Sequence, residues 1–352
     1  MNLTNNKIID SDIEEILSEK LDWKFFAGKS VLITGANGML PSYLVYTLLG
    51  LNETVLKSEP LVVYANVRNK NKAEEKFASL LKRDDFKLVV KDVVELTSFE
   101  EKIDIIIHAA SQASPKYYGV DPVGTLKANT IGTMNVLELA KNKNCEKLIF
   151  VSSGEVYGIL DGSIPVVDEK YTGNVDITNV RSCYAESKRM GETMCVSYAH
   201  QYGLIVNMIR LAHTYGPGCS LDDGRVFADF VKNIVNNQNI KINSDGSAKR
   251  CFLYVTDFVK GVFTVLLKGK NCEAYNICSV KETSIRELAK LLCGLYPEKN
   301  LKAEFLETKD DNNYIRSKST SGLLSNEKLK QLGWNEIVGV REGFFRMVES
   351  YL

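Results

Sequence analysis

A short apolar run, a turn with two glycines and a second apolar segment follow one another directly, and this order constrains the fold more than any other feature of the chain. The run is Ser30-Val31-Leu32-Ile33-Thr34, the turn is Gly35-Ala36-Asn37-Gly38, and residues 42–51 are again mostly apolar. Short continuous apolar runs suit strands of parallel sheets, which helices cover on both faces. We therefore expect a buried strand, a tight turn and a helix.

This order of elements predicts a site for a dinucleotide. Gly35 permits the tight turn, Gly38 lets the backbone approach a pyrophosphate, and the first helical turn offers free N–H groups to that anion. A turn with a purely structural role is the alternative. Pro41 stands where a third glycine is usual. Proline fits the first turn of a helix, so binding survives, but the packing of the helix on the strand must differ.

Further apolar runs alternate with helical segments. Strands are expected at residues 61–65, 86–90, 103–108 and 147–151, and a helix at 126–143. Such alternation predicts an α/β fold, a Rossmann-type doubly wound parallel sheet with a smaller C-terminal lobe. Turn-forming sequences become frequent after about residue 215. We expect a helical extension (1–28), a dinucleotide-binding domain with the catalytic residues (29–215) and a mainly substrate-binding lobe (216–352), part of which returns to the preceding domain.

The helical extension and the end of the second expected strand each carry a specific prediction. Ser11 is the expected N-cap of the first helix. Trp23, Phe25 and Phe26 are expected to fold this arm onto the body, and an arm that binds a partner is the alternative. An acidic residue at the end of the second strand usually binds the ribose 2′-hydroxyl of NAD. The chain has Asn66-Val67-Arg68 there, which leaves NAD and NADP open: Arg68 either meets a 2′-phosphate or is a solvated surface arginine.

Tyr184 and Lys188 are four residues apart in a segment with helical character, so they lie on one helix face. A lysine ammonium near a phenol favours the phenolate and lowers its pKa from about 10. Tyr184 would then accept a proton near neutral pH from a hydroxyl group whose carbon loses hydride. A chance pair on a solvated helix face is the alternative.

Composition excludes several classes of protein. Among 352 residues, 45% are hydrophobic and 25% charged, and 44 basic side chains balance 44 acidic ones, which argues against nucleic acid or a charged membrane as a partner. No apolar run approaches the ~20 residues of a membrane-spanning helix, and the first residues are polar and acidic. The eight cysteines form no C-x-x-C pair, so we expect reduced, mostly buried thiols, no metal site and a cytoplasmic location.

Several stretches carry a resemblance to a known family, over about residues 29–335. They are Ala113–Tyr118, Asn129–Thr133, Ser152–Gly158, Arg181–Tyr184, Asp223–Val226 and Lys249–Phe252. The chain resembles the extended short-chain dehydrogenase/reductases of the NAD-dependent epimerase/dehydratase family, and within them the UDP-glucuronate decarboxylases. The resemblance implies oxidation of the C4 hydroxyl of a nucleotide sugar to a ketone, followed by loss of CO2 from UDP-glucuronate.

The resemblance also implies roles for individual residues. Tyr184 would be the base, Lys188 would lower its pKa and bind the nicotinamide ribose, and Ser153 would hydrogen-bond the reacting hydroxyl. Glu155 and Arg250 match residues of the decarboxylation site. The expected cofactor contacts are Gly35, Asn37, Gly38, Met39, Leu40, Arg68, Asp92, Val93, Ala109 and Lys188. The expected substrate contacts are Tyr118, His213, Arg225 and Arg250.

Two departures from the family pattern keep alternatives open. Gly154 replaces a hydroxyl-bearing residue of the decarboxylases and the acidic aspartate of the 4,6-dehydratases, so dehydration is less favoured and 4-epimerisation is the second hypothesis. His213 replaces a common asparagine near the substrate diphosphate. A non-catalytic binding protein is a third hypothesis, opposed by the intact Ser153, Tyr184 and Lys188. By resemblance, a homodimer is expected through helices such as the one bearing Tyr184.

Overall fold

The computed structural model describes residues 2–160, 164–242, 244–305 and 323–352. Its centre is a seven-stranded sheet in the order β12-β7-β5-β4-β1-β2-β3, with every pair parallel. The strands are β1 (Ser30–Thr34), β2 (Val62–Val67), β3 (Phe86–Val90), β4 (Ile105–His108), β5 (Lys147–Ser153), β7 (Val206–Leu211) and β12 (Ala274–Ile277). Because the order reverses between β1 and β4, the sheet is doubly wound, which confirms the predicted fold class.

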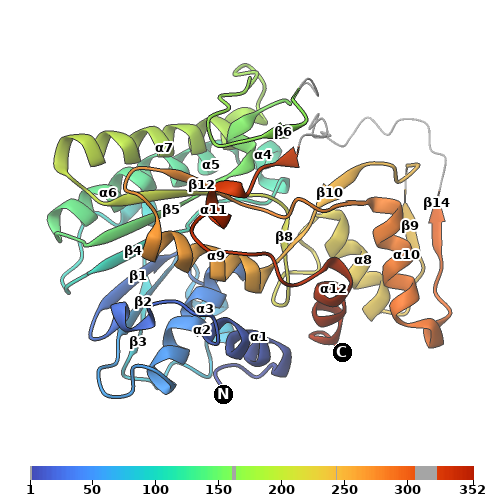
Figure 1. Ribbon diagram of the computed structural model, residues 1–352, viewed down its shortest axis with the longest axis horizontal. Coiled ribbons are helices and arrows are strands. Elements are labelled where there is room, and N and C mark those ends of the chain that lie inside the picture. Colours follow the sequence, from blue (N-terminus) through green and yellow to red (C-terminus); the bar gives the residue numbers. More distant parts are fainter. Residues whose placement is uncertain (1, 161–163, 243, 306–322) are drawn as a thin grey trace.

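Helices cover both faces of this sheet, as Figure 1 shows. One layer contains α1 (Lys7–Leu17), α2 (Met39–Glu53) and α9 (Val255–Lys268); the other contains α5 (Pro122–Asn129), α6 (Ile131–Asn142) and α7 (Ser182–Tyr202). Within β1, Val31 and Ile33 belong to the core under the first layer, and Leu32 belongs to the core under the second. Burial on both faces explains why the strand is apolar throughout.

The N-terminal helix begins earlier than predicted. Asn6, not Ser11, is its N-cap: Asn6 Oδ1 accepts hydrogen bonds from the N–H groups of Ile8 (3.1 Å) and Ile9 (3.2 Å). Ser11 lies inside the helix on its exposed side. The expected folding of this arm onto the body is confirmed, because Trp23 in the short 3-10 helix η1 (Trp23–Phe26) contacts the ring of Phe263 at 5.2 Å between centroids.

The buried carboxylate of Asp12 connects the N-terminal helix by hydrogen bonds to three other elements, α2, β11 (Leu253–Tyr254) and α12 (Val340–Glu349). Asp12 on α1 accepts hydrogen bonds from Tyr43 on α2 (2.9 Å), from Tyr254 (2.8 Å) and from Arg346 on α12 (3.0 Å). Desolvation by burial raises the pKa of Asp12, and these donors partly oppose the rise. The N-terminal helix is therefore tied both to the helix after the glycine turn and to the C-terminal helix.

The C-terminal part contains short sheets and helices beside the central sheet, and its α9 and β12 complete that sheet and one helical layer (Figure 1). The other strands are β6 (Val166–Val167), β8 (Thr214–Tyr215), β9 (Ile240–Ile242), β10 (Lys249–Cys251), β11 (Leu253–Tyr254), β13 (Glu282–Ser284), β14 (Ala303–Phe305) and β15 (Leu323–Leu324). The other helices are α3 (Lys70–Lys76), α4 (Lys116–Val120), α8 (Val226–Val235), α10 (Ile285–Leu295) and α11 (Glu327–Lys330). In the residues described, no helix combines the length and apolar character needed to cross a bilayer.

Candidate active site

The glycine turn connects β1 to α2 at the carboxyl edge of the sheet. Gly35 has φ +65°, and a Cβ there would lie 2.7 Å from Cα of Ala110, so the position requires glycine. Gly38 is the N-cap of α2 and offers no side-chain cap. Met39 and Leu40, the first residues of this 15-residue helix, line the cavity, so the start of the helix is suited to a pyrophosphate.

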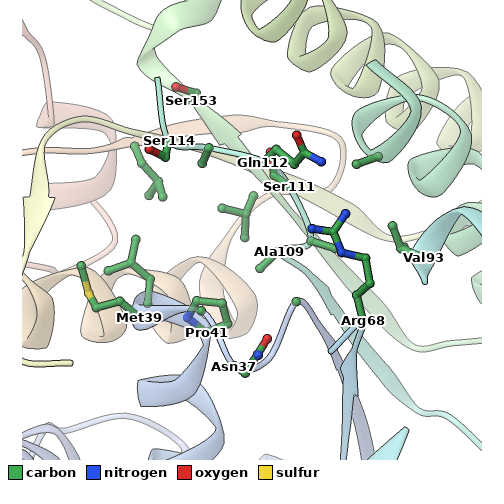
Figure 2. A pocket seen from close by; sticks show the side chains of 18 of the residues that line it. Asn37, Met39, Pro41, Arg68, Val93, Ala109, Ser111, Gln112, Ser114 and Ser153 are labelled. Carbon is green, nitrogen blue, oxygen red and sulfur yellow. The ribbon is translucent and has the colours of Figure 1, made fainter. Parts of the chain in front are cut away.

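A cavity of about 370 Å³ lies at the carboxyl ends of β1, β2, β4 and β5 (Figure 2). It brings together most of the residues predicted to bind a cofactor or to react. These are Gly35, Asn37, Gly38, Met39, Leu40, Arg68, Asp92, Val93, Ala109, Ser153, Tyr184, Lys188 and Arg225. Four others lie outside its lining: Glu155, Tyr118, His213 and Arg250.

Tyr184 and Lys188 lie one turn apart on α7 and are both buried, which excludes a chance pair on a solvated helix face. The Lys188 Nζ is 5.9 Å from the centroid of the Tyr184 ring and donates a 2.7 Å hydrogen bond to the carbonyl oxygen of Val151. Ser153, the last residue of β5, is also buried, and its hydroxyl accepts the N–H of Glu155 at 3.2 Å. The three side chains thus meet at the same wall of the cavity.

The predicted lowering of the Tyr184 pKa is wrong for this structure. Burial of the phenol raises its pKa to about 12; a hydrogen bond with Ser153 lowers it in part, the charge of Glu155 raises it, and Arg225 lowers it. Burial also lowers the pKa of Lys188 to about 7, while Glu192 opposes that change. The i, i+4 spacing predicted the placement of the two groups correctly, but desolvation is the largest influence on both.

Glu155 and Tyr118 belong to a cluster next to this wall. The Tyr118 ring stacks on the Tyr184 ring, 5.0 Å between centroids and 18° between planes. The Arg181 guanidinium lies 5.5 Å from the Tyr118 ring and forms a 3.1 Å ion pair with Glu155. Glu155 is 44% exposed in its side chain, so its carboxylate faces solvent at the outer side of the cluster. Sequence reasoning did not single out Arg181, although it is part of the family-like Arg181–Tyr184 stretch.

The remaining predicted substrate residues are Arg225 and Arg250, from the C-terminal part, and His213, which lies between β7 and β8. Arg225 is the N-cap of α8 and pairs with Asp223, which also lines the cavity. His213 has φ +35°, in the left-handed region that asparagine and histidine enter more readily than most residues. His213 is exposed as a residue, and desolvation of its ring, then the charges of Arg250 and Arg225, shift its pKa downward. Arg250, on β10, donates to the carbonyl oxygen of Lys249 (2.7 Å).

The residues at the cavity fit a dinucleotide. Besides the two glycines, the segment after β4 contributes polar side chains that the sequence did not reveal as contacts: Ser111, Gln112 and Ser114 (Figure 2). The buried hydroxyl oxygen of Ser111 has no hydrogen-bond partner among the described residues. Buried polar atoms are rarely left unsatisfied, so this hydroxyl is suited to a bound polar ligand.

Fold and site together define a class of protein. A doubly wound parallel sheet, a glycine turn at its switch point and a serine, tyrosine and lysine meeting at one cavity are the features of short-chain dehydrogenase/reductases. The model of the family described as "NAD dependent epimerase/dehydratase family" matches residues 31–278. The chain belongs to this NAD dependent epimerase/dehydratase family.

Relatives extend the match over nearly the whole chain. It is 34% identical over 330 residues to UDP-glucuronic acid decarboxylase 6 of Arabidopsis thaliana, covering 93% of this chain and 90% of that protein. It is 32% identical over 325 residues to UDP-glucuronic acid decarboxylase 1 of Danio rerio, covering 92% of this chain and 72% of that protein.

A solved structure shows the same fold at lower identity. UDP-glucuronic acid 4-epimerase from Bacillus cereus, in complex with UDP-glucuronic acid and NAD, superposes with a TM-score of 0.76 at 22% identity over 92% of this chain and 98% of that one. At this identity, the likeness establishes the architecture alone.

Proposed function

We propose that this protein is an NAD-dependent enzyme that oxidises the C4 hydroxyl of UDP-glucuronate and then releases CO2 from the 4-keto sugar. The observation that carries the proposal is the convergence of Ser153, Tyr184 and Lys188 on the cavity that begins at the glycine turn. Decarboxylation, rather than another outcome of C4 oxidation, is supported by the relatives that match over nine-tenths of the chain.

The bound dinucleotide supplies the hydride acceptor and donor. The N–H groups of Met39 and Leu40 at the start of α2 would hold its pyrophosphate, with Gly38 allowing close approach, and Lys188 would hold the nicotinamide ribose. Tyr184 takes the proton from the C4 hydroxyl while Ser153 hydrogen-bonds the same oxygen. Arg225 and the hydrogen bond with Ser153 favour the phenolate, so they oppose the effect of burial on the Tyr184 pKa.

A ketone at C4 makes loss of CO2 chemically accessible, because the carboxylate then lies β to the ketone. The electron pair left at C5 delocalises onto the C4 oxygen, where hydrogen bonds from Ser153 and Tyr184 stabilise the negative charge. We infer that Glu155 and Arg250 serve this step. Tyr118 and Arg181 would orient the carboxylate end of the sugar, since Tyr118 stacks directly on Tyr184 and the Arg181 guanidinium lies 5.5 Å from the Tyr118 ring.

The surroundings of Gly154 argue against a 4,6-dehydratase. A Cβ at this position would lie 3.1 Å from the carbonyl oxygen of Leu211 and 3.1 Å from Cδ1 of Leu324. The backbone and Leu324 thus occupy the space into which an acidic side chain would extend. The small residue remains compatible with 4-epimerisation, which is our second candidate because it uses the same C4 oxidation.

We further propose the arrangement of the whole protein. Residues 216–352 would provide most of the substrate lobe, since they contain Arg225 and Arg250, whose charges act on His213. A homodimer is supported by partly exposed apolar side chains on the packed helices α5 and α7, among them Val123 (57% exposed) and Met190 (49%). A cytoplasmic location is supported by eight free cysteines.

One assay separates the candidate reactions. The purified protein is incubated with NAD and a panel of nucleotide sugars that includes UDP-glucuronate and UDP-glucose, and the products are analysed by mass and stereochemistry. We expect UDP-glucuronate to lose the mass of CO2. Loss of water would identify a dehydratase, an unchanged mass with inverted C4 would identify an epimerase, and either result would overturn the proposed decarboxylation.

A further inference from the structure

Two cations stand side by side at the edge of the cavity where β2 and β3 end. Val67 and Val90 are register partners, and the N–H of Lys91 donates to the carbonyl oxygen of Val67 at 2.9 Å. Arg68 and Lys91 therefore leave neighbouring parallel strands at the same level, and both line the cavity. In doubly wound folds, the end of this second strand meets the ribose of the adenosine half.

No carboxylate is available on β2 to bind ribose hydroxyls. Residues 62–70 contain neither aspartate nor glutamate. Asn66 is 1% exposed, and its amide nitrogen donates to the carbonyl oxygens of Lys91 (2.8 Å) and Val89 (3.3 Å), which fixes the side chain between the strands. The repulsion by which an acidic residue normally excludes a 2′-phosphate is thus absent from this strand.

The Arg68 guanidinium is free to bind a ligand. Figure 2 shows it extending from β2 toward Ala109 and Val93, and it forms no hydrogen bond or ion pair with the described part of the chain. Its charge contributes to lowering the pKa of Asp121, but hydrogen bonds from Gln112 and Gly124 are the larger causes. Those donors occupy the Asp121 oxygens at 3.1 and 3.0 Å.

One carboxylate shares the cavity edge with the two cations. Asp92 lines the cavity, and its Oδ1 accepts the N–H of Val94 at 3.0 Å, which caps the turn η2 (Val93–Glu95). Arg68 and Lys91 outnumber this carboxylate in the cavity lining here, and Asp121, the other acidic group that the Arg68 charge reaches, lies outside the lining. Arginine suits a phosphate because its planar fork donates two hydrogen bonds to two oxygens.

We propose that Arg68, with Lys91 beside it, forms a subsite for a phosphate on the 2′-oxygen of the adenosine ribose, so that this chain binds NADP at least as tightly as NAD. The inference rests on the dinucleotide site of the proposed function and on nothing concerning the sugar. It assigns a second cofactor to a member of a family described as NAD dependent.

The test uses only the adenosine half of the cofactor. After removal of bound dinucleotide, the affinities of adenosine 2′,5′-bisphosphate and AMP are measured by calorimetry for the parent and for Arg68→Ala, Lys91→Ala and Lys87→Ala. Lys87 is an exposed lysine of β3 outside the cavity lining, so it controls for loss of one positive charge. Thermal melting verifies that each variant is folded.

We expect the parent to bind the bisphosphate about tenfold more tightly than AMP, or better. Arg68→Ala should reduce this preference to within about threefold and leave AMP affinity nearly unchanged, Lys91→Ala should reduce it in part, and Lys87→Ala should retain it. The preference for NADP over NAD should change among the four proteins in the same order as the preference for the bisphosphate over AMP. Equal affinities in the parent, a preference that survives Arg68→Ala, or an equal loss of AMP and bisphosphate would overturn the assignment. Because no sugar is present, the outcome is independent of the decarboxylation assay.

Discussion

Lys188 is a residue of this site whose protonation depends strongly on its surroundings. Its side chain is 2% exposed, and burial lowers its pKa from 10.5 to about 7. The sequence predicted that this lysine lies on the same helix face as the phenol. That prediction was possible because i, i+4 spacing depends only on the geometry of one helix. The sequence did not predict the burial, because that depends on β5 and the second helical layer, which are distant in sequence.

The Lys188 pKa has a consequence for stability. Between pH 7 and 10.5 the unfolded chain binds a proton at this lysine that the folded protein does not, so the free energy of unfolding rises with pH by up to about 1.4 kcal/mol per pH unit. Lys188→Met lacks this contribution. Denaturant titrations at pH 6, 8 and 9.5 should show the parent gaining stability relative to the variant. A constant difference across this range would contradict the burial of a titrating amine.

Glu155 is proposed to act after C4 oxidation, so its removal should separate the two steps. In Glu155→Gln, CO2 release from UDP-glucuronate should fall by at least about tenfold more than formation of the 4-keto intermediate, measured by rapid quench and mass analysis. Glu186→Gln is the matched control, since Glu186 lies on α7 and, among the residues that the structure describes, pairs with Arg189 at 3.8 Å. Equal losses in both steps would exclude Glu155 from decarboxylation.

At the scale of elements, comparing predicted with observed helix and strand bounds shows which bounds local sequence patterns predict correctly. β1 and β3 have the predicted bounds because continuous apolar runs end at turns. The helix predicted over 126–143 is in fact two helices that meet at Thr130, and α2 starts three residues earlier than predicted. Helix ends depend on caps and neighbours, and the first helix demonstrates this best, since a plausible Ser11 cap lies inside it.

The true cap of α1 can be identified by substitution. Asn6→Ala should lower the free energy of unfolding by about 1 kcal/mol, because two backbone N–H groups lose their acceptor. Ser11→Ala, on the exposed side of the same helix, should change it by less than about 0.5 kcal/mol. Denaturant titration measures both. A larger loss of unfolding free energy in Ser11→Ala than in Asn6→Ala would instead identify Ser11 as the cap.

At the scale of the whole molecule, the sheet explains why the convergence of residues on the cavity was predictable and why the contacts among Tyr118, Glu155 and Arg181 were not. The carboxyl ends of parallel strands meet at one edge, so residues following each strand converge whatever their separation in sequence. The stack of Tyr118 on Tyr184 and the pair of Arg181 with Glu155 depend instead on how α4, η3 (Gly154–Tyr157) and α7 pack together. No local pattern encodes that packing.

The proposed dimer predicts a change of assembly state. Met190→Asp combined with Val123→Asp should shift the protein to monomers in sedimentation velocity experiments, because charges would replace apolar side chains on α5 and α7. Ile337→Asp, at a side chain that is 61% exposed and outside these helices, should leave the assembly unchanged. A parent that sediments as a monomer would exclude the dimer.

The most direct test of the central claim is the turnover of UDP-glucuronate by Tyr184→Phe, compared with Tyr117→Phe, a partly exposed tyrosine outside the cavity lining. If Tyr184 takes the proton from the C4 hydroxyl, its loss should reduce turnover by at least about 100-fold while near-native melting shows that the fold is retained. Tyr117→Phe should remain near the parent rate. A Tyr184→Phe enzyme within a few-fold of the parent would contradict the proposed chemistry.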